Sequence, residues 1–237
     1  MAKQYLSSSF YATSNLKAYW RAEGNSLDET ANDHDGTDTA ITYGSAYGIL
    51  GQGASFNGTT SKIVITNHAD FRPTGDFSVG GWVKTSTGSR MVFQSYNQQG
   101  TGNQESFGIY IYIQSNGVLN VVCGNGTTVT PISYNTTNSI ATGAWVHWTV
   151  TRSSNTWTTY LNGVADGAQT AVGTPSYHAN NYVRIGVQYI DVGSYEGAYF
   201  SGSMDDIFFC NGTALTVTQI NELYAGSDGG SKIHMFL

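Results

Sequence analysis

The stretch GAWVHWTVTRSSNTWTTYLNGV, residues 143–164, indicates the fold class most clearly. It contains two strand-like runs rich in Trp, Val, Thr and Tyr, with Ser and Asn clustered between them. Such β-branched and aromatic residues favour the pleated surface of a sheet. Asn162-Gly163 supplies the positive φ values that a tight hairpin turn requires. The stretch therefore predicts antiparallel strands joined by hairpins.

Segments of the same kind recur from Leu16 onward, separated by clusters of Gly, Asn, Ser and Asp. They include KIVIT, FSVGGWV, MVFQSY, FGIYIYI, VLNVVC, YVRIGVQY and MDDIFF. One late segment, LTVTQINELYAG, instead predicts a short helix that begins at an N-cap, either Thr216 or Thr218, and ends at Gly226. We expect its inward face to carry Ile220, Leu223 and Tyr224.

The composition limits the possible functions. Charged residues make up 11% of the 237 residues, against roughly 25% in an average globular domain. The net charge is -6 and Lys and Arg do not cluster, so nucleic acid is not an expected partner. No apolar run approaches the roughly 18 residues of a membrane span, and the first residues contain no apolar core of a signal peptide. We therefore expect synthesis in a cytoplasm.

The chain reads as one domain, about residues 16–226, between an N-terminal arm, 1–15, and a C-terminal arm, 227–237. The C-terminal arm ends in the apolar IHMFL, and such groups favour burial, so we expect the arms to dock on a partner. Cys123 and Cys210 each lie in a strand-like run. They are expected to be buried thiols, although the sequence leaves open whether they form a disulfide.

Five segments, in order, resemble the laminin-G-like, concanavalin A-like jelly-roll domains that serve as binding modules. They are LKAYWRAEGNSLDETANDHDGT, GQGASFNGTTSKIVI, DFSVGGWVK, the stretch 143–164, and IGVQYIDVGSYEGAYFSGSMDDIFFCNGTALTVTQINELY. The resemblance covers nearly the whole core. It implies an all-β fold, a two-sheet antiparallel jelly-roll β-sandwich with one short C-terminal helix. Trp82 and Trp145 are expected to fill the space between the two sheets.

Asp205 and Asp206 lie side by side in the apolar segment MDDIFF, residues 204–209. Because neighbouring strand residues face opposite sides, at least one should face a core unless a bulge or a cation changes the arrangement. The resemblance places Asp205 in the closing strand and Asp28 in the first loop, where such domains often hold a structural Ca²⁺ ion. The implied ligands are Asp28, Asn32, Asp35 and Asp205. The alternative is that Asp205 accepts backbone N–H bonds from that loop without a metal.

Catalysis is not expected. Retaining glycosidases, which share this architecture, need two carboxyl groups roughly 5 to 5.5 Å apart. Asp33 and Asp35 have that i, i+2 spacing, but in a loop. No glutamate has an i+2 acid on a convincing strand; the five are Glu23, Glu29, Glu105, Glu196 and Glu222.

The histidines do not change this expectation. His147 lies in a strand-like run, where a packed or hydrogen-bonded ring is a better interpretation than a catalytic base. The others lie in loops or tails without a metal-ligand spacing such as His-x-x-x-His; they are His34, His68, His178 and His234.

Function is therefore expected on the surface. Lectins of this architecture stack aromatic rings on sugars and read hydroxyl groups with amides, and two long loops, residues 95–106 and 186–199, contain these residue types. The candidate ligand-binding residues are Tyr96, Asn97, Gln98, Asn103, Gln104, Tyr189, Asp191 and Tyr195. They predict a non-catalytic module that binds a glycan or cell-surface polysaccharide.

An apparent initiator Met, the arms and the lack of an export signal favour a carbohydrate-binding or adhesion component exposed on a virus (phage) particle, made in the host cytoplasm. The alternative is a structural decoration or tail protein that docks to capsid or tail protein through its arms. Either role implies a homo-oligomeric or larger assembly. Cytoplasmic or secreted locations are the alternatives to the virion.

Overall fold

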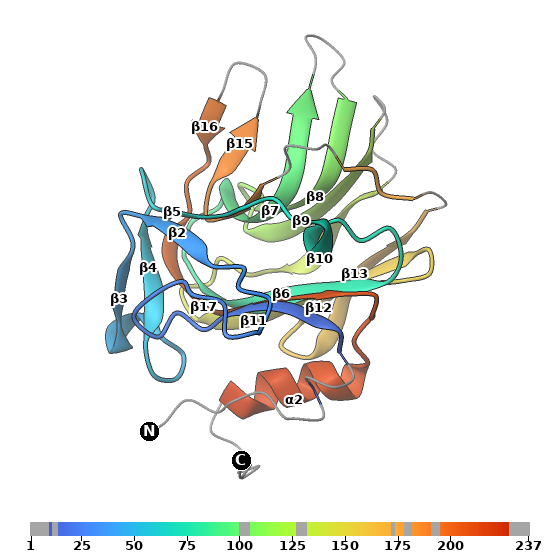
Figure 1. The fold of residues 1–237 in the computed structure, drawn as a ribbon. Helices are drawn as coiled ribbons and strands as arrows, with labels where there is room; N and C mark the ends of the chain where they lie inside the picture. The colour runs from blue at the N-terminus through green and yellow to red at the C-terminus, as the bar shows by residue number, and fades with distance from the viewer. Residues whose placement is uncertain are drawn as a thin grey trace.

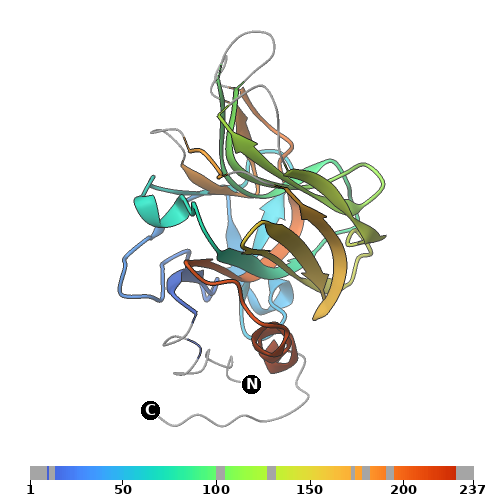
Figure 2. The same ribbon diagram turned by 90° about the vertical axis from the view of Figure 1, so that its right-hand side faces the viewer.

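Two stacked β-sheets with a helix outside them make up the fold of the described residues, as Figures 1 and 2 show. The structure, a computed structural model, describes residues 10, 14–99, 105–126, 132–171, 174–177, 182–190 and 195–227. Every strand pair in the described residues is antiparallel. The predicted two-sheet antiparallel jelly-roll with one short helix is confirmed.

The strands of the first sheet, eight in the described residues, follow the order β13-β12-β11-β6-β17-β4-β3, and β1 pairs with β17. Their bounds are β13 (Val164–Thr170), β12 (Thr156–Leu161), β11 (Trp145–Ser153), β6 (Phe77–Lys84), β17 (Ser201–Asn211), β4 (Gly53–Asn57), β3 (Thr42–Gly44) and β1 (Leu16–Trp20). β17 is therefore central: β6 lies along one side of it, and β4 and β1 share the other.

The second sheet has seven strands in the same residues, in the order β10-β9-β8-β7-β14-β5-β2. They are β10 (Ile132–Ser139), β9 (Val118–Asn125), β8 (Glu105–Ile113), β7 (Arg90–Gln99), β14 (Val183–Ile185), β5 (Lys62–Ile65) and β2 (Gly36–Thr39). A small hairpin, β15 (Gln188–Ile190) and β16 (Tyr195–Gly197), stands beside it at the top of Figure 1. Two 3-10 turns, η1 (Ser45–Tyr47) and η2 (Ala69–Phe71), lie in the connections.

The stretch 143–164 folds as its sequence predicts. β11 and β12 pair from Trp148–Leu161 to Ser153–Thr156. Asn162 and Gly163 then have φ values of 49° and 79° in the turn to β13. Besides its positive φ, the packing also requires glycine at position 163, because a Cβ on Gly163 would collide with the Asn221 side chain of the helix.

The space between the sheets holds one continuous hydrophobic core. Its largest buried side chains include Trp148, Trp157, Phe71, Phe77, Phe93 and Phe209. Several rings meet edge to face or stacked, which adds to the stabilisation that burial itself provides.

The expectation that Trp82 and Trp145 fill this core is wrong. The register places Trp148 opposite Gly81, so alternation turns Trp82 and Trp145 to the other face of the eight-stranded sheet. There Trp82 is buried and stacks on Tyr224 of the helix, with ring centroids 5.7 Å apart, while Trp145 is only half-buried. The sequence shows the strand but not which of its faces points inward.

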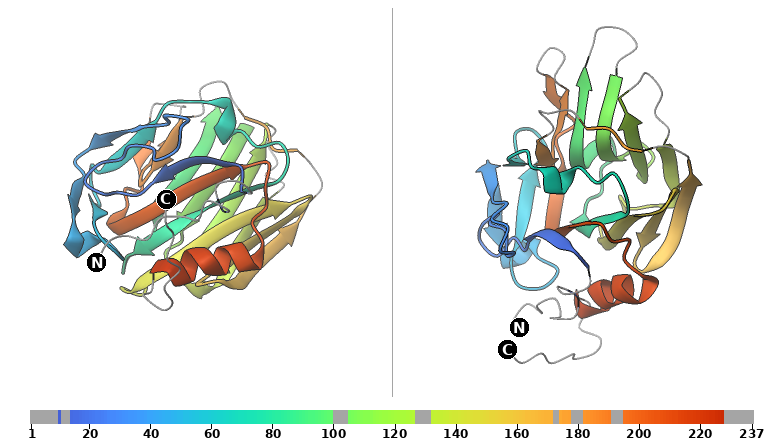
Figure 3. Two further views of the ribbon diagram at one scale, coloured as in Figure 1. Left: turned by 60° about the horizontal axis from the view of Figure 1, so that its bottom comes forward. Right: turned by 45° about the vertical axis from the view of Figure 1, so that its right-hand side comes forward.

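Helix α2 (Val217–Ser227) covers that outer face, as the left panel of Figure 3 shows. Thr216 caps it as predicted: Gln219 N donates to Thr216 Oγ1 at 3.3 Å, and Thr216 N donates to Gln219 Oε1 at 2.9 Å. The predicted inward face is confirmed, since Ile220 is fully buried, Leu223 packs on the same cluster and Tyr224 stacks on Trp82.

A second hydrophobic cluster forms under the helix and includes Phe10, which the sequence analysis assigned to the N-terminal arm. Phe10 is buried edge-on against Phe208. The other residues of the arms, apart from Ser14, Asn15 and Ser227, lie outside the described residues. The expected docking of the arms therefore stays a prediction.

Cys123 and Cys210 are free and buried, which confirms the thiol interpretation. Burial raises the pKa of each to about 12, so both stay neutral thiols at physiological pH. No helix in the described part of the chain is both long and apolar enough to cross a bilayer.

Candidate functional site

The paired acids of β17 are accommodated by a β-bulge. The register runs from Asp205–Trp82 to Phe208–Gly80, so one extra residue is inserted between them, and Asp206 has a φ of 50°. The bulge lies where the neighbour of β17 changes from β4 to β1.

Both carboxylates accept hydrogen bonds there. Asp205 is fully buried and accepts the backbone N–H of Ile49 at 3.0 Å, and Asp206 accepts the hydroxyl of Tyr19 at 2.7 Å. The two acids therefore hold the junction of three segments together.

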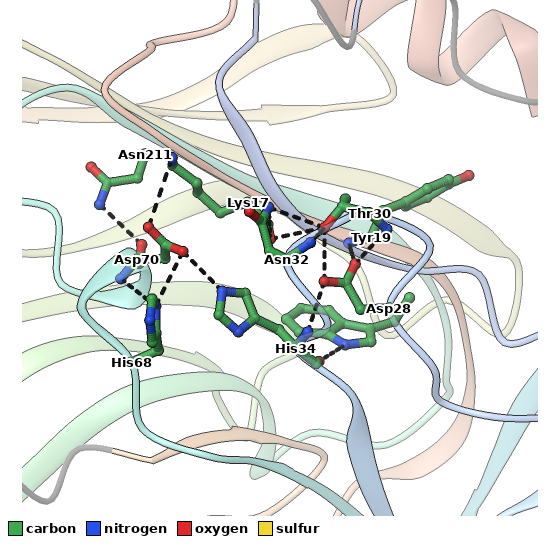
Figure 4. A network of polar contacts seen from close by, with 10 residues as sticks. Lys17, Tyr19, Asp28, Thr30, Asn32, His34, His68, Asp70 and Asn211 are labelled. Atoms are coloured by element: carbon green, nitrogen blue, oxygen red, sulfur yellow. Dashed lines mark hydrogen bonds and ion pairs between the residues drawn. The ribbon is translucent and has the colours of Figure 1, made fainter.

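Asp28 organises the first loop from within, as Figure 4 shows. Its Oδ1 accepts the backbone N–H groups of Tyr19 and Thr30, both at 2.9 Å. Its Oδ2 accepts the Thr30 hydroxyl at 2.8 Å and the N–H of His34 at 3.0 Å. Four donors thus surround one carboxylate.

The other implied calcium ligands also have protein partners. Asp35 Oδ1 accepts the N–H of Asp28 at 2.8 Å, and Asn32 donates through Nδ2 to the carbonyl of Lys17 at 2.9 Å. Asp205 accepts the N–H of Ile49, in the loop after η1. Because N–H and O–H donors already face both oxygens of Asp28, both of Asp205 and Oδ1 of Asp35, these carboxylates as arranged do not form a cation cage. The geometry favours the metal-free alternative, with the loop after η1 as one partner of Asp205, and calcium stays an untested prediction.

A second polar cluster lies beside this loop, at η2. His34 Nε2 lies 2.9 Å from Asp70 Oδ2, and His68 Nδ1 lies 3.1 Å from the same oxygen. Lys17 Nζ lies 3.7 Å from Asp70 Oδ1. Burial raises the pKa of Asp70, but the hydrogen bond with His34 and the charges of Lys17 and the two histidines lower it overall.

The sequence analysis found no metal-ligand spacing for His34 and His68, yet the fold brings them together with Asp70. The three side chains come from two separate loops, so no short motif contains them. The only local signal is that each histidine is followed by an aspartate, His34 by Asp35 and His68, two residues on, by Asp70.

A different surface surrounds the β15–β16 hairpin. Gln94, fully buried on β7, bonds the backbone of Tyr189 in both directions: its Nε2 donates to Tyr189 O at 2.8 Å, and its Oε1 accepts from Tyr189 N at 3.0 Å. The guanidinium of Arg184 lies 3.9 Å from the centroid of the Tyr189 ring and 5.4 Å from that of Tyr182. The hairpin is therefore fastened to the outer face of the seven-stranded sheet.

Aromatic rings continue across that face. Tyr110 and Tyr112 of β8 stack with centroids 5.6 Å apart and planes 19° apart, and both are half-buried. Gln188 Nε2 donates to the Tyr110 hydroxyl at 3.3 Å and so links these rings to the hairpin. On β16, Tyr195 is 54% exposed. We call Tyr110, Tyr112, Tyr182, Arg184, Gln188, Tyr189 and Tyr195 the hairpin surface.

A charged group flanks the hairpin surface. Lys62 Nζ lies 2.6 Å from Glu196 Oε2, and the Tyr199 hydroxyl donates to the same oxygen at 3.0 Å. Burial raises the pKa of Glu196, but the bonds from Lys62 and Tyr199 and the charge of Arg184 lower it overall. Glu196 is thus held as a carboxylate, which does not suit a general acid.

The structure places two of the eight candidate ligand-binding residues, Tyr189 and Tyr195, on this surface. Tyr96, Asn97 and Gln98 lie on β7, which runs beside β15, but their side chains are outside the description. The remaining candidates lie outside the described residues; they are Asn103, Gln104 and Asp191.

His147 is the packed histidine that the sequence predicts. It is 1% exposed, its ring lies 5.1 Å from that of Trp82, and no partner for its Nδ1 occurs among the described residues. Burial lowers its pKa to about 3. A neutral ring under a helix has no access to substrate, which excludes it as a base.

Solved structures share this fold. Domain 4 of AbnA, an arabinanase of Geobacillus stearothermophilus solved with arabinotriose, has a TM-score of 0.67 and 23% identity, over 89% of this chain and 98% of that one. The binding domain of Paraclostridial Mosquitocidal Protein 1 has a TM-score of 0.67 and 15% identity, over 89% and 52%. The binding domain of Botulinum Neurotoxin DC, solved in complex with SialylT, has a TM-score of 0.64 and 11% identity, over 90% and 52%.

The chain spans about half the length of these two toxin chains. No curated protein matches its sequence. The family profile described as the concanavalin A-like lectin/glucanases superfamily matches residues 56–221, which is more than half of the chain. On the basis of this match and the jelly-roll fold, the chain belongs to the concanavalin A-like lectin/glucanase superfamily.

Proposed function

We propose that the chain is a non-catalytic glycan-binding module and that the hairpin surface is its binding site. The observation that carries the proposal is the run of tyrosines and amides around β15–β16. In the described residues, the aromatic side chains that are clearly exposed are Tyr182 and Tyr195, and both belong to this surface.

The chemistry of the surface suits a sugar. Tyrosine rings offer flat apolar faces to the C–H faces of a pyranose or furanose ring, with a hydroxyl at the edge for hydrogen bonds. Gln188 adds an amide beside the rings, as expected for a site in which a few polar groups fix the orientation of the ligand. Because Gln94 bonds the backbone of Tyr189 and Arg184 packs on its ring, Tyr189 needs little further ordering on binding.

Two solved structures support the ligand class. The domain of AbnA was solved with arabinotriose and the neurotoxin domain with SialylT, so this fold carries glycans of different kinds. At these low identities the likeness shows the fold alone, and the position of the site rests on the hairpin surface.

A glycan array that includes arabinotriose and SialylT tests the proposal. Wild-type protein should bind at least one glycan, and Tyr112→Ala and Tyr195→Ala should each weaken that binding about tenfold or more, which matches roughly 1.4 kcal/mol of lost stacking and burial. The matched control is Val164→Ala, which truncates a side chain that is 68% exposed on β13. A flat array, or equal losses in all three variants, would contradict the proposal.

The setting on a virus particle stays a prediction. So does its alternative, docking to capsid or tail protein through the arms, because nearly all arm residues lie outside the described residues. An assay that mixes labelled protein with candidate particles, with and without the arms, addresses both.

A further inference from the structure

The cluster at η2 brings together three metal-ligating atoms from two loops. His34 lies in the connection between β1 and β2, and His68 is the N-cap residue of η2, which also carries Asp70. Figure 4 shows both imidazoles pointing at the Asp70 carboxylate. His34 Nε2, His68 Nδ1 and one Asp70 oxygen all lie within 4.8 Å of one another.

The spacing of these atoms suits one small cation. The two nitrogens lie 2.9 Å and 3.1 Å from Asp70 Oδ2. Ligands about 2.0 to 2.2 Å from a tetrahedral Zn²⁺ ion are roughly 3.3 to 3.6 Å apart. The two nitrogens lie within 4.8 Å of each other, so the ion requires rotation of the exposed His68 ring toward His34.

The contacts of His68 Nδ1 show which hydrogen bond a bound cation would replace. Its Nδ1 lies 3.2 Å from the backbone N–H of Asp70, which is a donor, and 3.1 Å from Asp70 Oδ2, which is an acceptor. One ring nitrogen cannot accept from the first and donate to the second. The single lone pair of Nδ1 can therefore bind a cation only in place of the long N–H bond from Asp70, and the exposed His68 side chain leaves room for the ring rotation that this exchange requires.

The ligands are also held in place. The N–H of His34 donates to Asp28 at 3.0 Å, its carbonyl accepts the indole N–H of Trp20 at 2.8 Å, and its ring packs on Phe71 with centroids 4.7 Å apart. These contacts fix the backbone and the ring of His34, so its Nε2 is held facing Asp70.

Asp70 is held from two sides. Its carbonyl accepts Asn211 Nδ2 at 3.0 Å, and Lys17 lies nearest to Oδ1, which leaves Oδ2 facing the imidazoles. His34 is 9% exposed, while the His68 side chain is 54% exposed, so the cluster is fixed on one side and reachable from solvent on the other.

We propose that His34 Nε2, His68 Nδ1 and Asp70 Oδ2 bind one Zn²⁺ ion, with water in the remaining position on the solvent side. Two imidazoles and one carboxylate suit zinc, whereas Ca²⁺ prefers a cage of oxygens. The site is independent of the hairpin surface. Its role is to hold the loop between β1 and β2 against η2.

Calorimetric titration of the chelator-stripped full chain with ZnCl₂ at pH 7.5, and in parallel with CaCl₂, tests the proposal. Wild-type protein should bind one Zn²⁺ per chain and no Ca²⁺ at these atoms. His68→Ala and Asp70→Asn should each weaken zinc binding at least as much as loss of an outer-sphere partner does, about 10-fold to 100-fold. Co²⁺ in place of zinc should give visible absorption bands that the same variants abolish.

The matched control is His147→Phe, which removes a histidine outside the cluster and should leave zinc affinity unchanged. His68 is at the surface, so His68→Ala is expected to keep the fold, and far-UV circular dichroism checks this. Absence of zinc binding by the wild type, or equal affinity in wild type, His68→Ala and Asp70→Asn, would overturn the proposal. Neither result bears on the glycan array.

Discussion

Burial of His147 predicts a specific loss of stability in mild acid. Its pKa is about 3 in the folded chain because the ring lies in a dry site under α2, against about 6.5 in an unfolded chain. Between these values the unfolded state binds a proton that the folded state does not. The contribution of His147 to the free energy of unfolding is therefore fully present above about pH 6.5 and is lost as the pH falls toward 3.

The magnitude follows from the difference in proton binding. At pH 5, which is about 1.5 units below the pKa of histidine in the unfolded chain, protonation lowers the free energy of the unfolded state. At about 1.36 kcal/mol per unit this amounts to about 2 kcal/mol. Urea unfolding of wild type and His147→Phe at pH 8 and pH 5 isolates this contribution, since other titrating groups cancel in the double difference. The phenyl ring keeps the contact with Trp82, which lies 5.1 Å from the histidine ring.

We expect the wild type to lose about 2 kcal/mol more than His147→Phe between pH 8 and pH 5. The variant Val164→Ala, which truncates a side chain that is 68% exposed, serves as the control and should behave like the wild type. Equal losses in wild type and His147→Phe would refute the burial of a neutral imidazole at this position.

Three further predictions follow from the packing and polar contacts. Asp205→Ala leaves the N–H of Ile49 without its acceptor and should cost about 1 to 3 kcal/mol in urea unfolding; an unchanged midpoint would contradict the role of the bulge. Added Ca²⁺ should not raise the melting temperature, because the donors around Asp28 already occupy its oxygens; a site at 100 times its Kd would instead add about 2.7 kcal/mol. Trp82→Ala removes the ring under Tyr224 and should cost about 3 to 5 kcal/mol, with faster amide exchange in α2; normal protection of the helix would contradict its docking.

Much of the fold was predictable because its signals are local. An Asn-Gly pair between strand-like runs, such as Asn162-Gly163, favours a tight hairpin turn. Thr216 and Gln219 form a capping pair within four residues. Which face of each strand points into the core was not predictable in the same way. A tryptophan in a strand is usually a core residue. Only the pairing of Trp148 with Gly81 shows that the next residue, Trp82, points to the helix.

The carboxylates of Asp205 and Asp28 were also predictable only in part. The sequence predicts that Asp205 requires a bulge or a partner, and the structure has both. It does not identify Ile49 as the partner, because the loop after η1 reaches β17 only through the pairing of β4. Asp28 was assigned to a shared site with Asp205, whereas its donors lie within its own loop and in β1.

The candidate sites depend most on tertiary structure. Tyr189 and Tyr195 were predictable from residue type on a long loop. Arg184 and Gln94, which hold the hairpin, were missed because each lies within a strand. A signal existed for Arg184, since a charged residue in the run VRI has to find a partner on the outer face.

The central claim is that the hairpin surface recognises a glycan without cleaving it. Nuclear magnetic resonance of protein with ¹³C-labelled tyrosine, titrated with the strongest glycan of the array, tests this most directly. We expect the resonances of Tyr110, Tyr112 and Tyr195 to shift and the glycan to remain intact throughout the incubation. Shifts confined to tyrosines of the other sheet, such as Tyr43 and Tyr160, or the release of shorter sugars, would contradict the claim.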